Sequence, residues 1–155
     1  MASIHLLTVG RLRAAYRAAA DEYLKRLSRL MPVQEREVRE AGRAGNPIAQ
    51  QREEGRRLAA GTPPGAITVA LTREGTAWSS LELARQVQRW QEGGRPMAFL
   101  IGGATGLEPG LVRSADVRWS LGPLTLPHEL ARVVVLEQLY RAATILAGQP
   151  YHKGK

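Results

Sequence analysis

Short apolar runs alternate with amphipathic stretches along the whole chain. Runs that are apolar, or that alternate between apolar and polar residues, predict five strands: Ser3–Val9, Val33–Arg39, Ala66–Leu71, Met97–Ile101 and Asp116–Leu121. Apolar residues at helical spacing predict five helices: Ala14–Leu30, Ile48–Ala60, Ser79–Gln91, Glu108–Ala115 and His128–Ala147. Strands that alternate with helices are typical of a parallel sheet. We therefore expect an α/β fold in which helices cover both faces of a parallel sheet.

The predicted strands differ in how much of their surface they would bury. Ala66–Leu71 (AITVAL) and Met97–Ile101 (MAFLI) carry no charge, as expected of strands covered on both faces. Val33–Arg39 (VQEREVR) alternates apolar with charged residues and predicts an edge strand. Gly42–Pro47 (GRAGNP) has the composition of a loop. Ser79 is placed to cap the helix that follows it.

The last predicted helix is apolar around most of its circumference. Its apolar residues are Leu130, Val133, Val134, Val135, Leu136, Leu139, Tyr140, Ala142, Ala143, Ile145 and Leu146. A surface helix needs only one apolar stripe, so this helix must be buried on two sides. One side can face the sheet and the other a second copy of the chain. We therefore expect a homodimer.

Length and composition narrow the class of protein. The 155 residues, 44% hydrophobic and 23% charged, predict a single globular domain over residues 1–155. No window approaches the ~20 apolar residues of a membrane helix, and the first residues lack a signal-peptide pattern. We expect a cytoplasmic protein with no membrane partner. Because the sequence has no cysteine, disulfides, thiol nucleophiles and thiolate zinc sites are excluded.

The charge of the chain indicates what it binds. A formal net charge of +8 favours a polyanionic partner, most often nucleic acid. The alternative is a solvated basic surface with no such partner. After Glu137 the sequence contains Arg141, Lys153 and Lys155 and no acid, so its C-terminal end is a local positive patch.

Two glycine-bearing loops follow the last two predicted strands. They are LIGGATGLEPG (Leu100–Gly110) and WSLGPLTLPHEL (Trp119–Leu130). In open α/β sheets, ligands bind beyond the carboxyl ends of the strands, where both loops lie. Gly102 and Gly103 have no Cβ, which would leave the main chain open to a ligand. The uncharged GPLTLP segment suits a flat, neutral heterocycle such as adenine. The alternative is that these glycines serve only the turns.

Several familiar kinds of site are absent from the sequence. It contains neither GxxxxGK[ST] nor GxGxxG, which argues against a P-loop and a standard dinucleotide fingerprint. His5, His128 and His152 are far apart in the sequence, and no HExxH motif or carboxylate cluster occurs. We therefore expect no metal.

Candidate ionisable residues lie on and after the last predicted helix. His128 opens this helix, where capping explains it as well as catalysis does. Glu137 and Arg141 stand at i, i+4 in the order that favours a salt bridge. Alternatively, Arg141 faces a phosphate or carboxylate in a groove. Tyr151 and His152 lie in the basic terminus, which offers few neighbouring elements for these side chains to stabilise, so a purely structural role is disfavoured.

Several motifs together resemble a known family over essentially the whole chain. They are TVGRLR and EYLKRL near the start, LIGGATGL, WSLGPLTLPHELARVVVLEQLYRA and the terminal PYHK. These motifs are similar to those of the RlmH-type (YbeA-type) ribosomal large-subunit methyltransferases of the SPOUT superfamily. The resemblance implies S-adenosylmethionine-dependent methylation of N3 of a pseudouridine in 23S rRNA. It also implies a C-terminal trefoil knot and a homodimer in which each site lies near the other subunit.

The resemblance also assigns site residues. The cofactor site falls on Leu71, Gly103, Gly122, Pro123, Leu124, Thr125, Leu126 and Pro127. The substrate and catalytic face falls on His128, Arg132, Arg141, Tyr151 and His152. The reaction needs a base for the N3 proton, or a cation that stabilises the uracil anion, and His152 and Arg141 could supply these. Family members commonly have acids where this chain has Thr72 and Thr105, so roles that need those carboxylates are open.

Two other functions remain as alternatives. One is a knotted methyltransferase that acts on a tRNA or on another rRNA base. The other is a ribosome-associated RNA-binding protein without catalysis, for which Thr72 and Thr105 are the only hints. Because a chain this small has no separate RNA-binding domain, we expect the substrate to be 23S rRNA within assembled ribosomal particles.

Overall fold

Five parallel strands form one sheet in the computed structural model, which describes residues 1–42 and 45–154. They are β1 (Ile4–Val9), β2 (Val33–Val38), β3 (Ile67–Ala77), β4 (Met97–Ile101) and β5 (Val117–Ser120), in the order β2-β1-β4-β3-β5. Every neighbouring pair is parallel. The predicted parallel sheet is confirmed, and the charged segment Val33–Arg39 forms an edge strand as predicted. The predicted loop Gly42–Pro47 includes Arg43 and Ala44, which lie outside the described residues.

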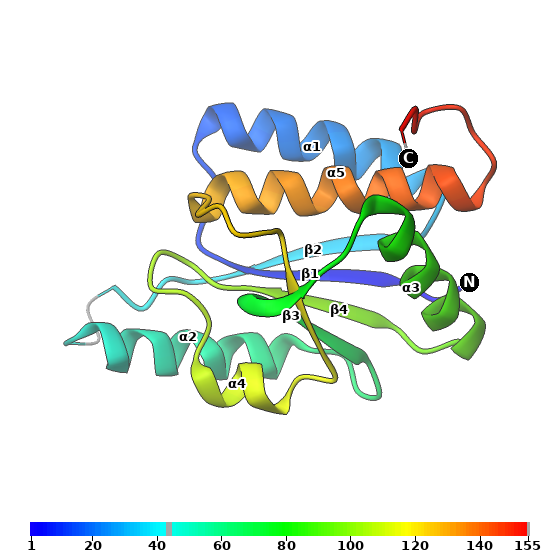
Figure 1. Cartoon of the computed structure of the whole chain (residues 1–155). Helices are drawn as coiled ribbons and strands as arrows, with labels where there is room; N and C mark the ends of the chain where they lie inside the picture. Colours follow the sequence, from blue (N-terminus) through cyan, green and yellow to red (C-terminus); the bar gives the residue numbers. More distant parts are fainter. Residues whose placement is uncertain (43–44, 155) are drawn as a thin grey trace.

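Five helices cover the two faces of the sheet (Figure 1). They are α1 (Ala14–Ser28), α2 (Pro47–Gly61), α3 (Ser80–Gly93), α4 (Pro109–Ser114) and α5 (His128–Leu146). Helices α1, α3 and α5 lie on one face, and α2 and α4 lie on the other. Side chains along β1 alternate between the two faces of the sheet. Leu6 packs in the larger hydrophobic core with α1, α3 and α5, and Leu7 packs in a smaller core with α2 and α4. The prediction of helices on both faces is confirmed.

Local sequence signals set the starts of three helices. Ser79 caps α3 in a capping box with Glu82, since each side chain accepts a hydrogen bond from the other residue's backbone N–H. Asn46 accepts a hydrogen bond from the Ala49 N–H at the start of α2. Glu108 accepts hydrogen bonds from the first turn of α4. The predicted cap at Ser79 is therefore confirmed.

Strand β3 is longer than the sequence predicted. The expected strand ended at Leu71, whereas β3 continues to Ala77 after an irregularity in its pairing with β5. Leu71 and Thr76 both pair with Trp119, so residues 72–75 form a bulge on the β3 side. Gly75 makes this bulge possible, because a Cβ at this residue would lie 2.6 Å from the Trp119 backbone nitrogen.

A cluster of aromatic rings lies between α3 and the sheet. The Trp78 and Trp119 rings stack with their centroids 6.0 Å apart, and Trp90 packs against Trp78 at 6.1 Å. Phe99 of β4 meets Trp90 and Trp119 edge-on. Trp119 thus anchors the end of β5 in this core, directly before the loop that follows the strand.

Helix α5 is buried partly by its own chain. It packs on the sheet with α1 on one flank and α3 on the other (Figure 1), so these helices cover much of the apolar circumference that predicted a second subunit. Leu130 and Val134, four residues apart and therefore on one face of the helix, stay partly exposed. The predicted dimer therefore needs to cover only this outer face.

Candidate active site

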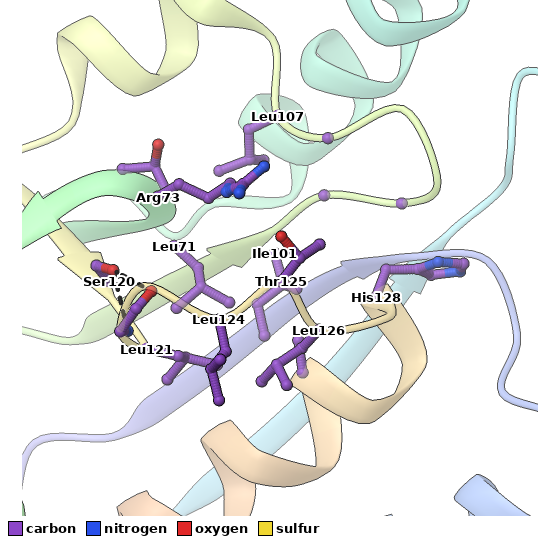
Figure 2. Close-up of a pocket in the computed structure, with 16 residues that line it drawn as sticks. Leu71, Arg73, Ile101, Leu107, Ser120, Leu121, Leu124, Thr125, Leu126 and His128 are labelled. Carbon is purple, nitrogen blue, oxygen red and sulfur yellow. Dashed lines mark hydrogen bonds between the residues drawn. The ribbon is translucent and has the colours of Figure 1, made fainter. Parts of the chain in front are cut away.

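A pocket lies at the carboxyl ends of β3, β4 and β5, where their loops meet the first turn of α5. The cavity measures about 190 Å³. It is lined by Leu71, Thr72, Arg73, Ile101, Gly102, Gly103, Gly106, Leu107, Ser120, Leu121, Gly122, Leu124, Thr125, Leu126, His128 and Ala131. Figure 2 shows the labelled leucines and Ile101 as its apolar walls. This is the edge of the sheet at which a ligand was expected.

Most residues of the predicted cofactor site line this pocket. They are Leu71, Gly103, Gly122, Leu124, Thr125 and Leu126. Pro123 and Pro127 belong to the same loop but are not among the lining residues. His128, predicted on the catalytic face, also lines the pocket. Sequence reasoning missed Arg73, although the glycine two residues later is a signal for a bulge.

The loop after β5 is held in shape by its own hydrogen bonds. The Gly122 N–H donates to Ser120 Oγ over 3.1 Å. Gly122 has φ +116°, a conformation that disfavours any residue with a Cβ. This combination fixes the path of the uncharged segment that follows, with Leu124 and Leu126 on one wall of the pocket.

The glycines after β4 serve packing within the chain. A Cβ on Gly102 would lie 2.4 Å from the Gly106 carbonyl carbon, and one on Gly103 would lie 3.0 Å from Val9 Cγ1. The expectation that these glycines leave space for a ligand was therefore wrong in its reason. Both line the pocket, but their missing side chains make room for the protein's own atoms.

Helix α2 braces this glycine loop from behind. The Gln51 side-chain amide donates to the Thr105 carbonyl over 2.6 Å. Glu54, only 2% exposed, accepts hydrogen bonds from the Ala41 N–H at 3.1 Å and the Thr105 hydroxyl at 3.4 Å. The Glu54 carboxylate of α2 therefore lies beside Thr105, the position at which family members commonly have an acid. Sequence reasoning missed Glu54, because a glutamate in a charged helix resembles a solvated residue.

The first turns of α5 hold the loop after β1. Glu129 accepts hydrogen bonds from the Arg13 backbone N–H and from Arg13 Nε, and the backbone hydrogen bond is the main reason that its pKa is lowered. Arg132 donates to the Gly10 carbonyl over 2.9 Å and forms an ion pair with Glu37. Its side chain is 1% exposed, so Arg132, which the resemblance placed on the substrate face, serves the fold instead.

A second group of ionisable side chains gathers where the C-terminal tail folds back on α5. Arg141 Nη2 donates to Glu137 Oε2 over 2.7 Å, which confirms the predicted salt bridge. Tyr151 Oη donates to the same carboxylate oxygen over 2.8 Å. Arg141 Nη1 lies 3.1 Å from His152 Nδ1, and its guanidinium stands over the Tyr151 ring. The tail is therefore tied to α5.

These contacts fix the protonation of the cluster. Burial, followed by the hydrogen bond to Glu137, raises the pKa of Tyr151 to about 12, so this phenol stays neutral at physiological pH. The hydrogen bond from Arg141 to Glu137 raises the arginine's own pKa. Because a guanidinium can only donate, His152 Nδ1 must accept. The ring proton of His152 then lies on Nε2, which is buried and has no partner among the described residues.

A family model described as predicted SPOUT methyltransferase matches residues 2–152 of the chain. The chain belongs to the SPOUT methyltransferase family. Two named relatives agree with this assignment. Ribosomal RNA large subunit methyltransferase H of Xanthomonas campestris is 49% identical over 135 residues, which cover 85% of this chain and 86% of the relative. The protein of the same name from Anaeromyxobacter dehalogenans is 43% identical, covering 97% of this chain and 99% of the relative.

Solved structures share the fold at low sequence identity. A probable methylase family protein from Haemophilus influenzae superposes with TM-score 0.60 at 13% identity, covering 97% of this chain and 70% of that one. A probable methyltransferase from Bordetella pertussis gives TM-score 0.57 at 16% identity, covering 92% of this chain and 96% of that one. These likenesses support the α/β fold of a SPOUT methyltransferase. The C-terminal trefoil knot stays a prediction.

In this SPOUT methyltransferase, the pocket and the C-terminal cluster lie far apart within one chain. His128 and Arg141 are thirteen residues apart on α5, which corresponds to about 20 Å along the helix axis. Figure 1 shows the tail folding back over the C-terminal half of α5, away from the loops that form the pocket. The structure therefore brings His128 to the pocket and groups Arg141, Tyr151 and His152 elsewhere.

The described part of the SPOUT methyltransferase has neither a membrane-spanning helix nor a cluster of metal-binding side chains. Over residues 1–42 and 45–154, no helix combines the length and apolar character needed to cross a membrane. The same part of the chain holds no group of three or more His, Asp or Glu side chains that could bind a metal ion.

Proposed function

We propose that this protein is a single-domain, cytoplasmic methyltransferase that uses S-adenosylmethionine to methylate N3 of a pseudouridine in 23S rRNA. The observation that carries the proposal is the pocket at the carboxyl edge of the sheet, built from the two glycine-bearing loops. Relatives named for methylation of large-subunit ribosomal RNA, 43% and 49% identical, support the choice of substrate. The net charge of +8 is consistent with a ribosomal RNA partner.

The lining residues fit S-adenosylmethionine. Leu71 and Ile101 offer apolar surface to an adenine ring, and the neutral loop with Thr125 and Leu126 offers backbone polar groups. A Cβ added at Gly122 would meet no atom within 4 Å, so the space beside this residue is open. We assign the nucleoside to this loop.

The protein's own residues must prepare the target base for methyl transfer. S-adenosylmethionine supplies an already activated methyl group, so the protein must align the base with it and exclude water. N3 becomes a nucleophile only when its proton passes to solvent water, and a positive charge beside the ring favours the resulting anion. Arg141 can supply that charge, because its side chain is 24% exposed and already held in place by Glu137.

Hydrogen-bond geometry changes the expected role of His152. A base needs a free lone pair, but Nδ1 accepts from Arg141 and Nε2 carries the proton. In this arrangement His152 and Tyr151 are hydrogen-bond donors. We therefore propose that His152 and Tyr151 act as positioning residues: His152 Nδ1 holds the Arg141 guanidinium, and Tyr151 orients Glu137.

A complete site requires two subunits. The pocket and the C-terminal cluster are about 20 Å apart along α5, which is too far for methyl transfer within one chain. We propose a homodimer in which the tail of one subunit reaches the pocket of the other. The partly exposed Leu130 and Val134, and Leu124 with 78% exposure beside the pocket, support an interface on this side.

Mass spectrometry of RNA tests the proposed substrate. In a strain that lacks the gene, 23S rRNA should lose one methyl group on a pseudouridine, and the purified protein should restore it. We expect assembled ribosomal particles to be methylated far faster than naked rRNA. Loss of a methyl group from tRNA instead would favour the alternative enzyme. Calorimetry that detects no binding of S-adenosylmethionine would favour a non-catalytic RNA-binding protein.

A further inference from the structure

The bulge in β3 places an arginine over the pocket. Residues 72–75 leave the pairing with β5, and Arg73 stands at the exposed turn of this bulge while also lining the cavity. In Figure 2 the Arg73 side chain extends from β3 toward Leu107, across the pocket from Leu124 and Leu126. Bulges next to active sites commonly redirect one side chain.

The backbone on either side of Arg73 is held in place by neighbouring residues. Gly75 lies against the backbone of β5, where a Cβ would be 2.6 Å from Trp119 N. The Thr72 hydroxyl donates to Glu74 Oε2 over 2.5 Å, which closes the turn around Arg73. The neighbouring carboxylate is therefore directed toward Thr72.

Arg73 supplies the fixed positive charge of the pocket. Apart from His128, the other lining residues are apolar side chains, glycines or hydroxyl groups. Among the described residues, no hydrogen bond or ion pair engages the Arg73 guanidinium; the arginines that do form ion pairs are Arg13, Arg17, Arg26, Arg56, Arg57, Arg132 and Arg141. A guanidinium at the mouth of a neutral pocket selects a ligand with an anionic group.

We propose that Arg73 binds the carboxylate of the amino-acid part of S-adenosylmethionine. This inference rests on the proposed function. The carboxylate is the only anionic group of that cofactor, and a planar guanidinium can hold it with two parallel hydrogen bonds. Arg73 thereby sets which end of the ligand lies beneath the bulge, with the nucleoside against the loop after β5.

Calorimetry with two ligands tests this assignment. 5′-Methylthioadenosine keeps the nucleoside and the methyl-bearing sulfur, now as a neutral thioether, but lacks the amino-acid part. We expect Arg73→Gln to weaken S-adenosylmethionine binding by roughly tenfold or more, as for loss of a charge-assisted hydrogen bond, and to leave methylthioadenosine binding unchanged. Arg73→Lys should recover part of the loss. Arg113→Gln, the same change at an exposed residue outside the pocket, should leave both affinities as in the wild type.

Each other result overturns the proposal in a recognisable way. Equal weakening of both ligands would mean that Arg73 only shapes the pocket. Unchanged cofactor affinity, with weaker ribosome binding and a shallower salt dependence, would assign Arg73 to an RNA phosphate. If the wild type binds no S-adenosylmethionine, the proposed function and the role of Arg73 are both overturned, whereas the two results above overturn the role of Arg73 alone.

Discussion

Arg132 crosses from α5 to the edge strand β2 almost without contact with solvent. Its guanidinium meets Glu35, Glu37 and the Gly10 carbonyl, and its side chain is 1% exposed. Replacing it with methionine removes the buried cation and leaves the partly exposed Arg17 as the remaining partner of Glu35 and Glu37, so we expect the free energy of unfolding to fall by roughly 2 kcal/mol. Urea denaturation measures this loss. A change below about 0.5 kcal/mol, as for an ordinary surface substitution, would contradict the structural role.

Tyr151 gives the molecule a specific response to high pH. Its pKa is raised from 10.0 to about 12, chiefly by burial and then by the hydrogen bond to Glu137. Because the folded pKa is the higher one, the stabilising contribution is complete below pH 10 and is lost as the pH rises through 12. The tyrosinate absorbance of the wild type minus that of Tyr151→Phe should have its midpoint near 12. Glu137→Gln should lower this midpoint, and a wild-type midpoint at the ordinary tyrosine value would refute the packing of the tail.

At the scale of elements, α2 holds the glycine loop in place through Glu54. Replacing Glu54 with alanine leaves the buried Ala41 N–H without its acceptor, which should lower the free energy of unfolding by roughly 1–3 kcal/mol. We also expect weaker S-adenosylmethionine binding, because Thr105 then keeps only its hydrogen bond from Gln51. Gln50→Ala is the matched control, since Gln50 contacts the same carboxylate but not the loop. Identical behaviour of the two variants would deny Glu54 this role.

The outer face of α5 carries the dimer prediction. Val134→Glu places a charge on the partly exposed face next to Leu130, and a charge buried twice at a symmetric interface is costly. We expect light scattering to change from about twice 17.0 kDa to 17.0 kDa. The helical circular dichroism signal should stay the same. A variant that remains dimeric would move the interface elsewhere.

Most elements could be predicted because each has a local cause. The charge-free runs gave β3 and β4 their central places, and the Ser79 cap fixed the start of α3. The bulge after Leu71 could not be placed, because it depends on how closely Gly75 approaches β5. Gly103 was assigned to the pocket, but the reason that it is glycine, the nearby Val9, is a tertiary contact. Glu54 and Arg73 were missed because their roles arise only when distant loops meet.

For the molecule as a whole, the separation of pocket and tail predicts complementation between inactive subunits. A chain that ends at Pro150 keeps the pocket but lacks Tyr151 and His152, and Leu126→Trp fills the pocket but keeps the tail. Each protein alone should be inactive. After random exchange of subunits, half the dimers pair one of each kind, and each such dimer has one working site, so about one quarter of wild-type activity should return. Transfer of a labelled methyl group to ribosomal particles measures it. A mixture that stays inactive would place the whole site within one subunit.

The aromatic cluster beneath this site has an optical consequence. Trp119 stacks on Trp78 at 6.0 Å and is followed directly by Ser120 and Leu121, which line the pocket. Indole emission depends on the distance and polarity of neighbouring groups, and the three tryptophans of the chain all lie in this cluster. A ligand that shifts the loop after β5 by a fraction of an ångström would therefore alter the intrinsic fluorescence of the protein. Rapid mixing could then follow the arrival and departure of the ligand in real time, without any attached dye.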